Sequence, residues 1–205
     1  DNCTKLTHIV FGNQFNNPLH NALDNCTSLT HINFGRDFSQ PLLNSFDKLS
    51  SLTHINFGGG FNQPLGNALN NCTSLTHLTF GYHFNQPLTN LLNHCQSITH
   101  LTLGEDYNQR DELPNNIRYI KLDSNNGNLV EHLPDSIAEL ELGYNFNLDL
   151  YNCPSSIKKI IFAKNSRYHK KLNCLPNGLS ILELPVGYNH QIENIPNGLK
   201  KLSCS

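Results

Sequence analysis

The chain has 205 residues, of which 15% are charged and 38% are hydrophobic, and its formal net charge is −2. It has no apolar run close to the ~18 residues that a membrane-spanning helix needs, and no secretory signal opens it. A general binder of nucleic acids or membrane surfaces needs a basic surface, which a nearly neutral chain does not offer. We therefore expect neither a membrane partner nor a nucleic-acid partner.

A repeat of about twenty residues runs through the whole sequence. In the first half the segment Leu-Thr-His-(Ile/Leu)-x-Phe-Gly recurs four times with a step of 23 residues. Looser copies follow with steps of 19, 20, 20, 22 and 20 residues. The first apolar residues of the ten copies are Leu6, Leu29, Leu52, Leu75, Ile98, Ile117, Ile137, Ile157, Leu179 and Leu199. Such self-similarity is typical of solenoids, in which each repeat packs only against its neighbours.

Each repeat predicts one short strand. Apolar residues lie at its first, fourth and sixth places, as in Leu29, Ile32 and Phe34, and the last two alternate like a strand with one buried face. Successive strands have the same direction and lie about twenty residues apart, so each return path crosses over to a parallel neighbour. We expect a right-handed, curved α/β repeat solenoid over residues 1–205, with a parallel sheet on its concave face.

A glycine, an aromatic residue and usually an asparagine follow each strand, as in Gly58, Phe61 and Asn62. We interpret the glycine as permitting a tight turn and the ring as filling the core between coils. The asparagine is expected to be buried and to bond to the backbone of its own coil and the next. All three are therefore interpreted as structural residues.

The return path differs between the two halves. Over residues 1–104, blocks such as Pro87, Leu88, Leu91 and Cys95 have helical spacing with proline near the start, which predicts a helix of about two turns in each coil. Over residues 105–205 the block shortens to Leu-Pro-x-x-Ile, which favours thinner coils with extended return segments. The first half should therefore be backed by short helices and the second should not.

A row of histidines occupies the third place of the first five strands. Third and fifth places point away from the core, so these side chains should stack on the concave face about 4.8 Å apart. The row comprises His8, His31, His54, His77 and His100, with Asn33 and Asn56 at fifth places. In the second half the same two columns contain Tyr119, Lys121, Glu139, Glu141 and Lys159, whose opposite charges should pair between adjacent strands.

The histidine row admits two interpretations. Imidazole is a good metal ligand, but a straight ladder offers parallel rings and not the convergent set that a metal ion needs. The alternative is a neutral surface whose charged form is disfavoured by repulsion between neighbouring imidazoles, so that acidification would charge it. We assign no metal and no cofactor to the chain.

The cysteines and the remaining charges point to structure and not to chemistry. Four cysteines share one repeat position with Leu49, which indicates a small buried hydrophobe, and the odd total of seven argues against a disulfide framework. The basic run from Lys158 to Lys171 is interpreted as a solvated face. No constellation of nucleophile, base and acid stands out, so we predict that the protein is not an enzyme.

The strand pattern Leu-x-x-Leu-x-Leu resembles leucine-rich repeats, and the blocks Phe61 to Leu65 and Phe84 to Leu88 resemble the FNIP (IP22) repeat of amoebae and giant viruses. This resemblance implies a protein-interaction module that binds a partner on its concave face. It also implies an adaptor that selects substrates for ubiquitin ligation through a preceding module such as an F-box. The implied location is the cytoplasm, that of the host if the protein is viral.

Two other functions remain open at this stage. A structural scaffold without a specific ligand is favoured by the near-identity of the first five strands, and a metal-binding ladder is the third candidate. The last strand, from Leu199 to Cys204, would expose an edge, so we also expect a homodimer or a preceding domain to cover one end.

Overall fold

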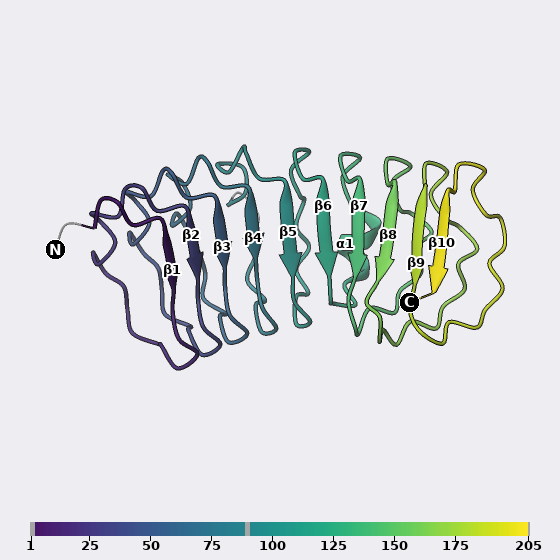
Figure 1. Ribbon diagram of the computed structural model, residues 1–205, viewed down its shortest axis with the longest axis horizontal. Coiled ribbons are helices and arrows are strands. Elements are labelled where there is room, and N and C mark those ends of the chain that lie inside the picture. Colours follow the sequence, from purple (N-terminus) through teal and green to yellow (C-terminus); the bar gives the residue numbers. More distant parts are fainter. Residues whose placement is uncertain (1–2, 89–90, 205) are drawn as a thin grey trace. The chain divides into compact units, whose positions relative to one another are not determined.

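The computed structural model describes residues 3–88 and 91–204. The chain forms two compact units, residues 1–107 and residues 108–205. Each unit is a stack of coils in which every repeat contributes one strand to a parallel sheet. The predicted parallel-sheet solenoid is thereby confirmed (Figure 1).

The first unit contains strands β1 (His8–Val10), β2 (His31–Asn33), β3 (His54–Asn56), β4 (His77–Thr79) and β5 (His100–Leu103). The pairing is parallel and in register with the repeat, so that each histidine is the Cα partner of the histidine in the next strand. The 23-residue step therefore fixes the register, because equal coils bring equal places side by side.

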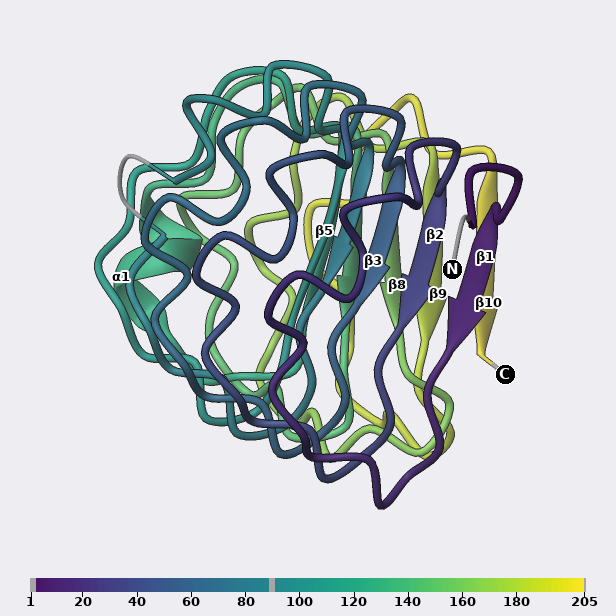
Figure 2. The same ribbon diagram turned by 90° about the vertical axis from the view of Figure 1, so that its left-hand side faces the viewer.

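The second unit contains strands β6 (Tyr119–Leu122), β7 (Glu139–Leu142), β8 (Lys159–Phe162), β9 (Ile181–Leu184) and β10 (Lys201–Cys204). These strands are also parallel, and the unequal steps between them leave the third places of β6 to β10 aligned. In each unit the return segments lie on the side of the coil opposite to the strands (Figure 2).

Stacked aromatic rings fill the core of the first unit. Phe34, Phe57 and Phe80 lie 5.3 Å apart from ring to ring, and each packs against the ring that follows the glycine of its own coil. All of these rings are buried. The prediction that an aromatic residue fills the core between coils is confirmed.

The asparagine that follows this ring bonds to the next coil, as expected, but it lies at the surface. The Asn16 Oδ1 atom accepts from the Ser39 backbone N–H at 2.9 Å, and Asn62 Oδ1 accepts from the Asn85 N–H at 2.9 Å. Both asparagines are exposed. The prediction of a buried amide was therefore wrong for these two residues.

The recurrent glycine serves close approach between coils and not a special turn. None of Gly35, Gly58, Gly81 and Gly104 has a positive φ. A Cβ atom on Gly58 would lie far inside contact distance of the Gly35 carbonyl group, and the other three glycines are equally tight. The expectation of a tight turn at this glycine is corrected accordingly.

The predicted helices behind the first half were wrong. The described residues of the first unit contain no helix, and their return segments are successions of turns closed by bonds from residue i+3 to residue i, such as Ser45 N–H to Leu42 O at 2.8 Å. The residue that follows Pro-Leu adopts a left-handed conformation, with φ of 44° at His20, 44° at Leu43 and 49° at Gly66. A left-handed residue stops a right-handed helix directly after its proline start.

The only helix among the described residues lies in the second unit, where extended segments were expected. It is α1 (Gly127–Glu131), and it is five residues long. The Asn126 side chain caps it by accepting from the Leu129 N–H at 3.2 Å and also donates to the Gln109 carbonyl at 2.7 Å. No helix among the described residues has the length and apolar character needed to cross a bilayer.

The left-handed residues yield a test of the return segments. Leu43 is 73% exposed, so little packing offsets the strain of its φ of 44°. Leu43→Asn is expected to raise the free energy of unfolding by about 0.5–1 kcal/mol, because asparagine tolerates this conformation. Gly66→Ala should lower it by about 1 kcal/mol, since a Cβ atom at Gly66 meets no neighbour and only the backbone is strained. Urea unfolding followed by circular dichroism measures both, and shifts of the same sign would contradict this explanation.

Candidate functional site

The five histidines of the first unit form a continuous stack on the exposed face of its sheet. The ring centroids are 4.3 Å apart between His8 and His31, and the distance decreases along the row to 4.0 Å between His77 and His100. The planes of successive rings differ by 10° to 15°. We call this surface, together with Asn33 and Asn56, the histidine face. The structure therefore brings together all the residues that the sequence placed in this row.

A threonine sets the orientation of each ring. The Oγ1 atom of Thr53 lies 2.8 Å from the Nδ1 atom of His54 and also donates its hydrogen to the Thr30 carbonyl at 3.0 Å. The hydroxyl has only one hydrogen, so Nδ1 must supply the hydrogen of the bond between threonine and imidazole. Thr30 and Thr76 make equivalent pairs of bonds, one to the histidine that follows them, His31 or His77, and one to the threonine carbonyl of the preceding coil.

This arrangement leaves the other ring nitrogen as an acceptor. In a neutral imidazole with its hydrogen on Nδ1, Nε2 carries the lone pair. Within the described residues, the Nε2 atoms of His31, His54 and His77 have no hydrogen-bond partner. The histidine face therefore presents a row of hydrogen-bond acceptors to a ligand.

The inner rings of the stack resist protonation. Burial lowers the pKa values of His31, His54 and His77, and repulsion from neighbouring imidazoles lowers them further. The pKa of His77 falls to about 4. The direction agrees with the expected repulsion, although burial is the larger cause. These three rings are consequently neutral at physiological pH.

A shallow groove follows the histidine face. It has a volume of about 370 Å³ and is lined by four of the histidines, the intervening apolar residues and the fifth-place side chains Val10, Asn33, Asn56 and Thr79. The Nδ2 atom of Asn56 donates to Asn33 Oδ1 at 3.2 Å, which continues the ladder beside the rings. Polar acceptors and apolar surface therefore lie side by side in this groove.

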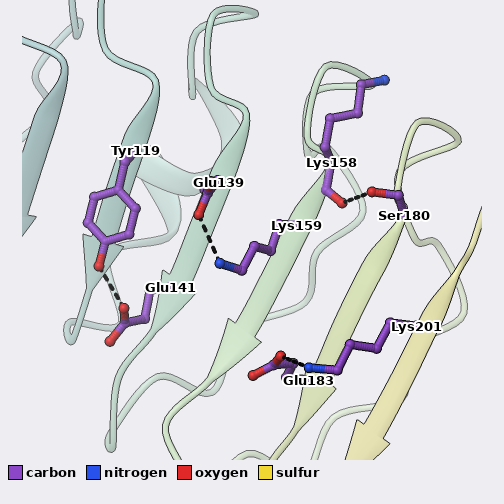
Figure 3. Close-up of polar contacts among 8 residues, drawn as sticks. All are labelled: Tyr119, Glu139, Glu141, Lys158, Lys159, Ser180, Glu183 and Lys201. Atoms are coloured by element: carbon purple, nitrogen blue, oxygen red, sulfur yellow. Dashed lines mark hydrogen bonds and ion pairs between the residues drawn. The ribbon is translucent and has the colours of Figure 1, made fainter.

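The exposed face of the second unit is occupied by its own ion pairs (Figure 3). Lys159 pairs with Glu139 at 3.1 Å, and the Tyr119 hydroxyl donates to Glu141 at 2.6 Å. Lys121, which the figure does not draw, pairs with Glu141 at 2.5 Å. The predicted pairing between adjacent strands is confirmed. Burial disfavours the ionised form of Glu141, but the bonds from Lys121 and Tyr119 outweigh it and lower its pKa.

The described cysteines form no disulfide and no metal cluster. All seven are free, and Cys26, Cys72 and Cys95 are buried at the repeat position where Leu49 stands in the third coil. Burial raises the pKa of the Cys72 thiol to about 12 and that of Cys95 to about 11, so both are protonated and unreactive. Residues 3–88 and 91–204 contain no group of three or more His, Cys, Asp or Glu residues that could hold a metal ion.

Sequence reasoning missed a second hollow, at the edge of the first sheet where its strands end. A pocket of about 420 Å³ is lined there by Arg36, Asp37, Gly59, Gly60, Tyr82 and His83. The His83 Nδ1 atom lies 2.8 Å from a carboxylate oxygen of Asp106 in the next coil. The signal that could have revealed it is the pair Gly59-Gly60, which replaces two side chains present in every other coil of this unit.

These features define a class of protein, the leucine-rich-repeat solenoids, in which each repeat gives one strand to a parallel sheet. The BspA type leucine-rich repeat region matches residues 1–99 in six copies, and the FNIP repeat matches residues 128–165. The repeats over residues 1–99 and 128–165 therefore match the leucine-rich and FNIP types, the two types that the sequence predicted. The Phe-Asn-Gln-Pro-Leu blocks themselves lie in the segment matched by the BspA type. A comparison with curated proteins finds no match.

Two solved structures illustrate the likeness. An internalin, InlF from Listeria monocytogenes, is 17% identical with a TM-score of 0.64, and the match covers 99% of this chain and 62% of that chain. CroV588, a circular LRR protein, is 24% identical with a TM-score of 0.45, and the match covers 98% of this chain and 43% of that chain. The chain thus spans less than two thirds of either structure. The internalin match supports the fold alone.

Proposed function

We propose that the chain is a protein-recognition module and that the histidine face binds the partner. The observation that carries the proposal is the contrast between the two exposed sheet faces. In the first unit the acceptor atoms of His31, His54 and His77 border a groove, whereas in the second unit the charged groups already pair with one another. A ligand gains most where hydrogen-bonding groups are preorganised and their own partners need not be removed.

The second face belongs to the proposal with a smaller contribution. Tyr119, Lys121, Glu139, Glu141 and Lys159 line it, and a partner that contacts them must either preserve or replace their mutual bonds. Exposed ion pairs of this kind contribute little affinity. These ion pairs would steer the approach of the partner and help to select it.

The resemblance to FNIP proteins supports a narrower form of the proposal, in which the bound partner is a substrate for ubiquitin ligation in the cytoplasm. This form depends on a module outside residues 1–205. Its test is ubiquitination of the identified partner by the full-length parent in cells, with and without the histidine face. The alternative of a structural scaffold is favoured by the near-identical histidine rungs, and it predicts no selective ligand.

Selection from a random-peptide display library separates recognition from scaffolding. Peptides enriched on the wild-type chain should bind at least about tenfold more weakly to the triple variant His31→Ala, His54→Ala and His77→Ala, as expected for central contact residues. Fluorescence polarisation of the labelled synthetic peptides measures this loss. The matched control changes Asn21, Asn44 and Asn67 to alanine, three exposed repeat positions on the return side.

Two outcomes would contradict the proposal. Peptides that bind the wild type and the histidine variant equally would place recognition elsewhere on the molecule. A library that yields no enriched peptide, with folded protein verified by circular dichroism, would favour the scaffold.

A further inference from the structure

The repeat of the first unit breaks at one place in the loops that follow its strands. Two residues after the recurrent glycine form two columns along the edge of the sheet: Asn13-Gln14, Arg36-Asp37, Gly59-Gly60, Tyr82-His83 and Glu105-Asp106. Four of the five coils fill both columns with side chains, and the third coil fills neither. A gap one coil thick therefore lies between Arg36-Asp37 on one side and Tyr82-His83 on the other, and it is the pocket of about 420 Å³ described above.

The floor of this gap is rigid. The Gly60 N–H donates to the Arg36 carbonyl at 2.7 Å, and the His83 N–H donates to the Gly59 carbonyl at 3.0 Å, so that the third coil is bonded on both sides. A Cβ atom on Gly60 would collide with the Arg36 carbonyl, which explains the glycine there. A Cβ atom on Gly59 would meet only the Arg36 side chain, at 4.0 Å, so Gly59 is not required by packing.

The dimensions of the gap suit one planar group. Neighbouring strands lie about 4.8 Å apart, so the walls stand roughly 10 Å apart from backbone to backbone, with one rung left out. The missing rung has the thickness of a single stacked side chain. A flat group inserted there would take the place that Arg36 or Tyr82 occupies in its own coil.

The walls offer two kinds of contact. In the first column Arg36 and Tyr82 line the gap, and guanidinium and phenol groups both bind the faces of aromatic rings. Tyr82 is 56% exposed, and within the described residues the side chains of Arg36, Asp37 and Tyr82 have no hydrogen-bond or ion-pair partner. These groups are therefore available to a ligand.

The second column offers acceptors. An ionised carboxylate only accepts, so the hydrogen between Asp106 and His83 resides on Nδ1, and the Nε2 atom of a neutral His83 carries a lone pair. Asp37 across the gap also accepts. A ligand that reaches this column needs an N–H or O–H at its edge.

We propose that the gap binds one aromatic side chain of the partner protein that carries a ring N–H or O–H, which is to say tryptophan or tyrosine. The ring lies between Arg36 and Tyr82, and its donor reaches Asp37 or His83. This inference rests on the proposed function, because it names an anchor by which the partner is held. It uses the edge of the sheet and not the histidine face.

The test uses N-acetyltryptophanamide as the probe. The chain contains no tryptophan, so indole fluorescence reports the probe alone. We expect saturable binding to the wild type, with a dissociation constant on the order of 1 mM for so small a ligand. We expect binding at least about tenfold weaker for Tyr82→Ala and for Gly59→Tyr, which supplies the missing rung. Asn13→Tyr, which places the same side chain in the same column of the first coil, is the matched control and should bind like the wild type.

N-acetylphenylalaninamide, which has no ring donor, tests the acceptors by competition and should displace the probe at least about tenfold less well than N-acetyltyrosinamide. Unchanged probe binding by folded Gly59→Tyr would overturn the proposal, and equal competition by the two derivatives would overturn the role of Asp37 and His83. The triple histidine variant should still bind the probe. Binding at the histidine face and binding in the gap are thus tested separately.

Discussion

Replacing Gly58 with alanine should lower the free energy of unfolding by about 3 kcal/mol or more, one of the largest effects available from a single methyl group. The added Cβ atom would collide with the Gly35 carbonyl and with the Arg36 backbone, neither of which can move without separating the two coils. Because repeat proteins gain stability from contacts between neighbouring coils, the loss is concentrated at one junction.

Gly12→Ala is the matched control for this change. At the same repeat position in the first coil, a Cβ atom added to Gly12 would have no neighbour within 4 Å, so the midpoint of urea unfolding should stay close to that of the wild type. Circular dichroism during urea titration compares the two variants. Equal midpoints for Gly58→Ala and Gly12→Ala would show that the glycine ladder is not a close contact between coils.

Acidification from about pH 6.5 to pH 5 should destabilise the folded chain through the histidine stack. The pKa values of His31, His54 and His77 are lower in the folded state than the ordinary histidine value, so the unfolded state binds more protons in this range. Stability therefore rises with pH across this window and is lost as the pH falls through the unfolded pKa. The pKa of His77 is about 4, so protonation of this residue alone would lower the free energy of unfolding by at most about 3 kcal/mol if the pH fell to that value. Solvent screening reduces this amount.

The variant His31→Gln, His54→Gln and His77→Gln isolates this effect, since glutamine keeps a polar side chain but does not titrate. Its urea midpoint should change much less between pH 6.5 and pH 5 than that of the wild type. A window that stops at about pH 5 keeps most carboxyl groups ionised. An equal loss of stability in both proteins would place the pH dependence outside the stack.

The sequence allowed the strands to be predicted because two periodicities agree. Alternation within Leu-Thr-His-Ile-x-Phe assigns the faces of a strand, and the constant 23-residue step assigns its register. With both known, the placement of His31, His54 and His77 in one row follows from geometry, and the pairing of Lys121 with Glu141 follows in the same way.

The return segments could not be predicted in this manner. Pro87, Leu88, Leu91 and Cys95 have helical spacing, but spacing of apolar residues also satisfies a succession of turns that faces the core. The deciding feature is the left-handed backbone at His20, Leu43 and Gly66, and only Gly66 signals it by its residue type. The curvature and handedness of the array stay predictions.

The gap at Gly59-Gly60 was missed for the opposite reason. Recurrent residues predict the recurrent strands and core, whereas this pocket arises at the one coil whose loop lacks the two side chains. Column-by-column reading of the variable loop residues would have found it.

The central claim is that the five imidazoles form one ordered row on the sheet, and that His31, His54 and His77 in this row have hydrogen on Nδ1 and an open Nε2. Long-range nitrogen–hydrogen correlation and nuclear Overhauser spectra of uniformly labelled protein at about pH 7.5, above the ordinary histidine pKa, test it directly. The account predicts the Nδ1–H tautomer for His31, His54 and His77, with ring-to-ring contacts from His31 to His54 and from His54 to His77. The Nε2–H tautomer at these residues, or rings without mutual contacts, would contradict it.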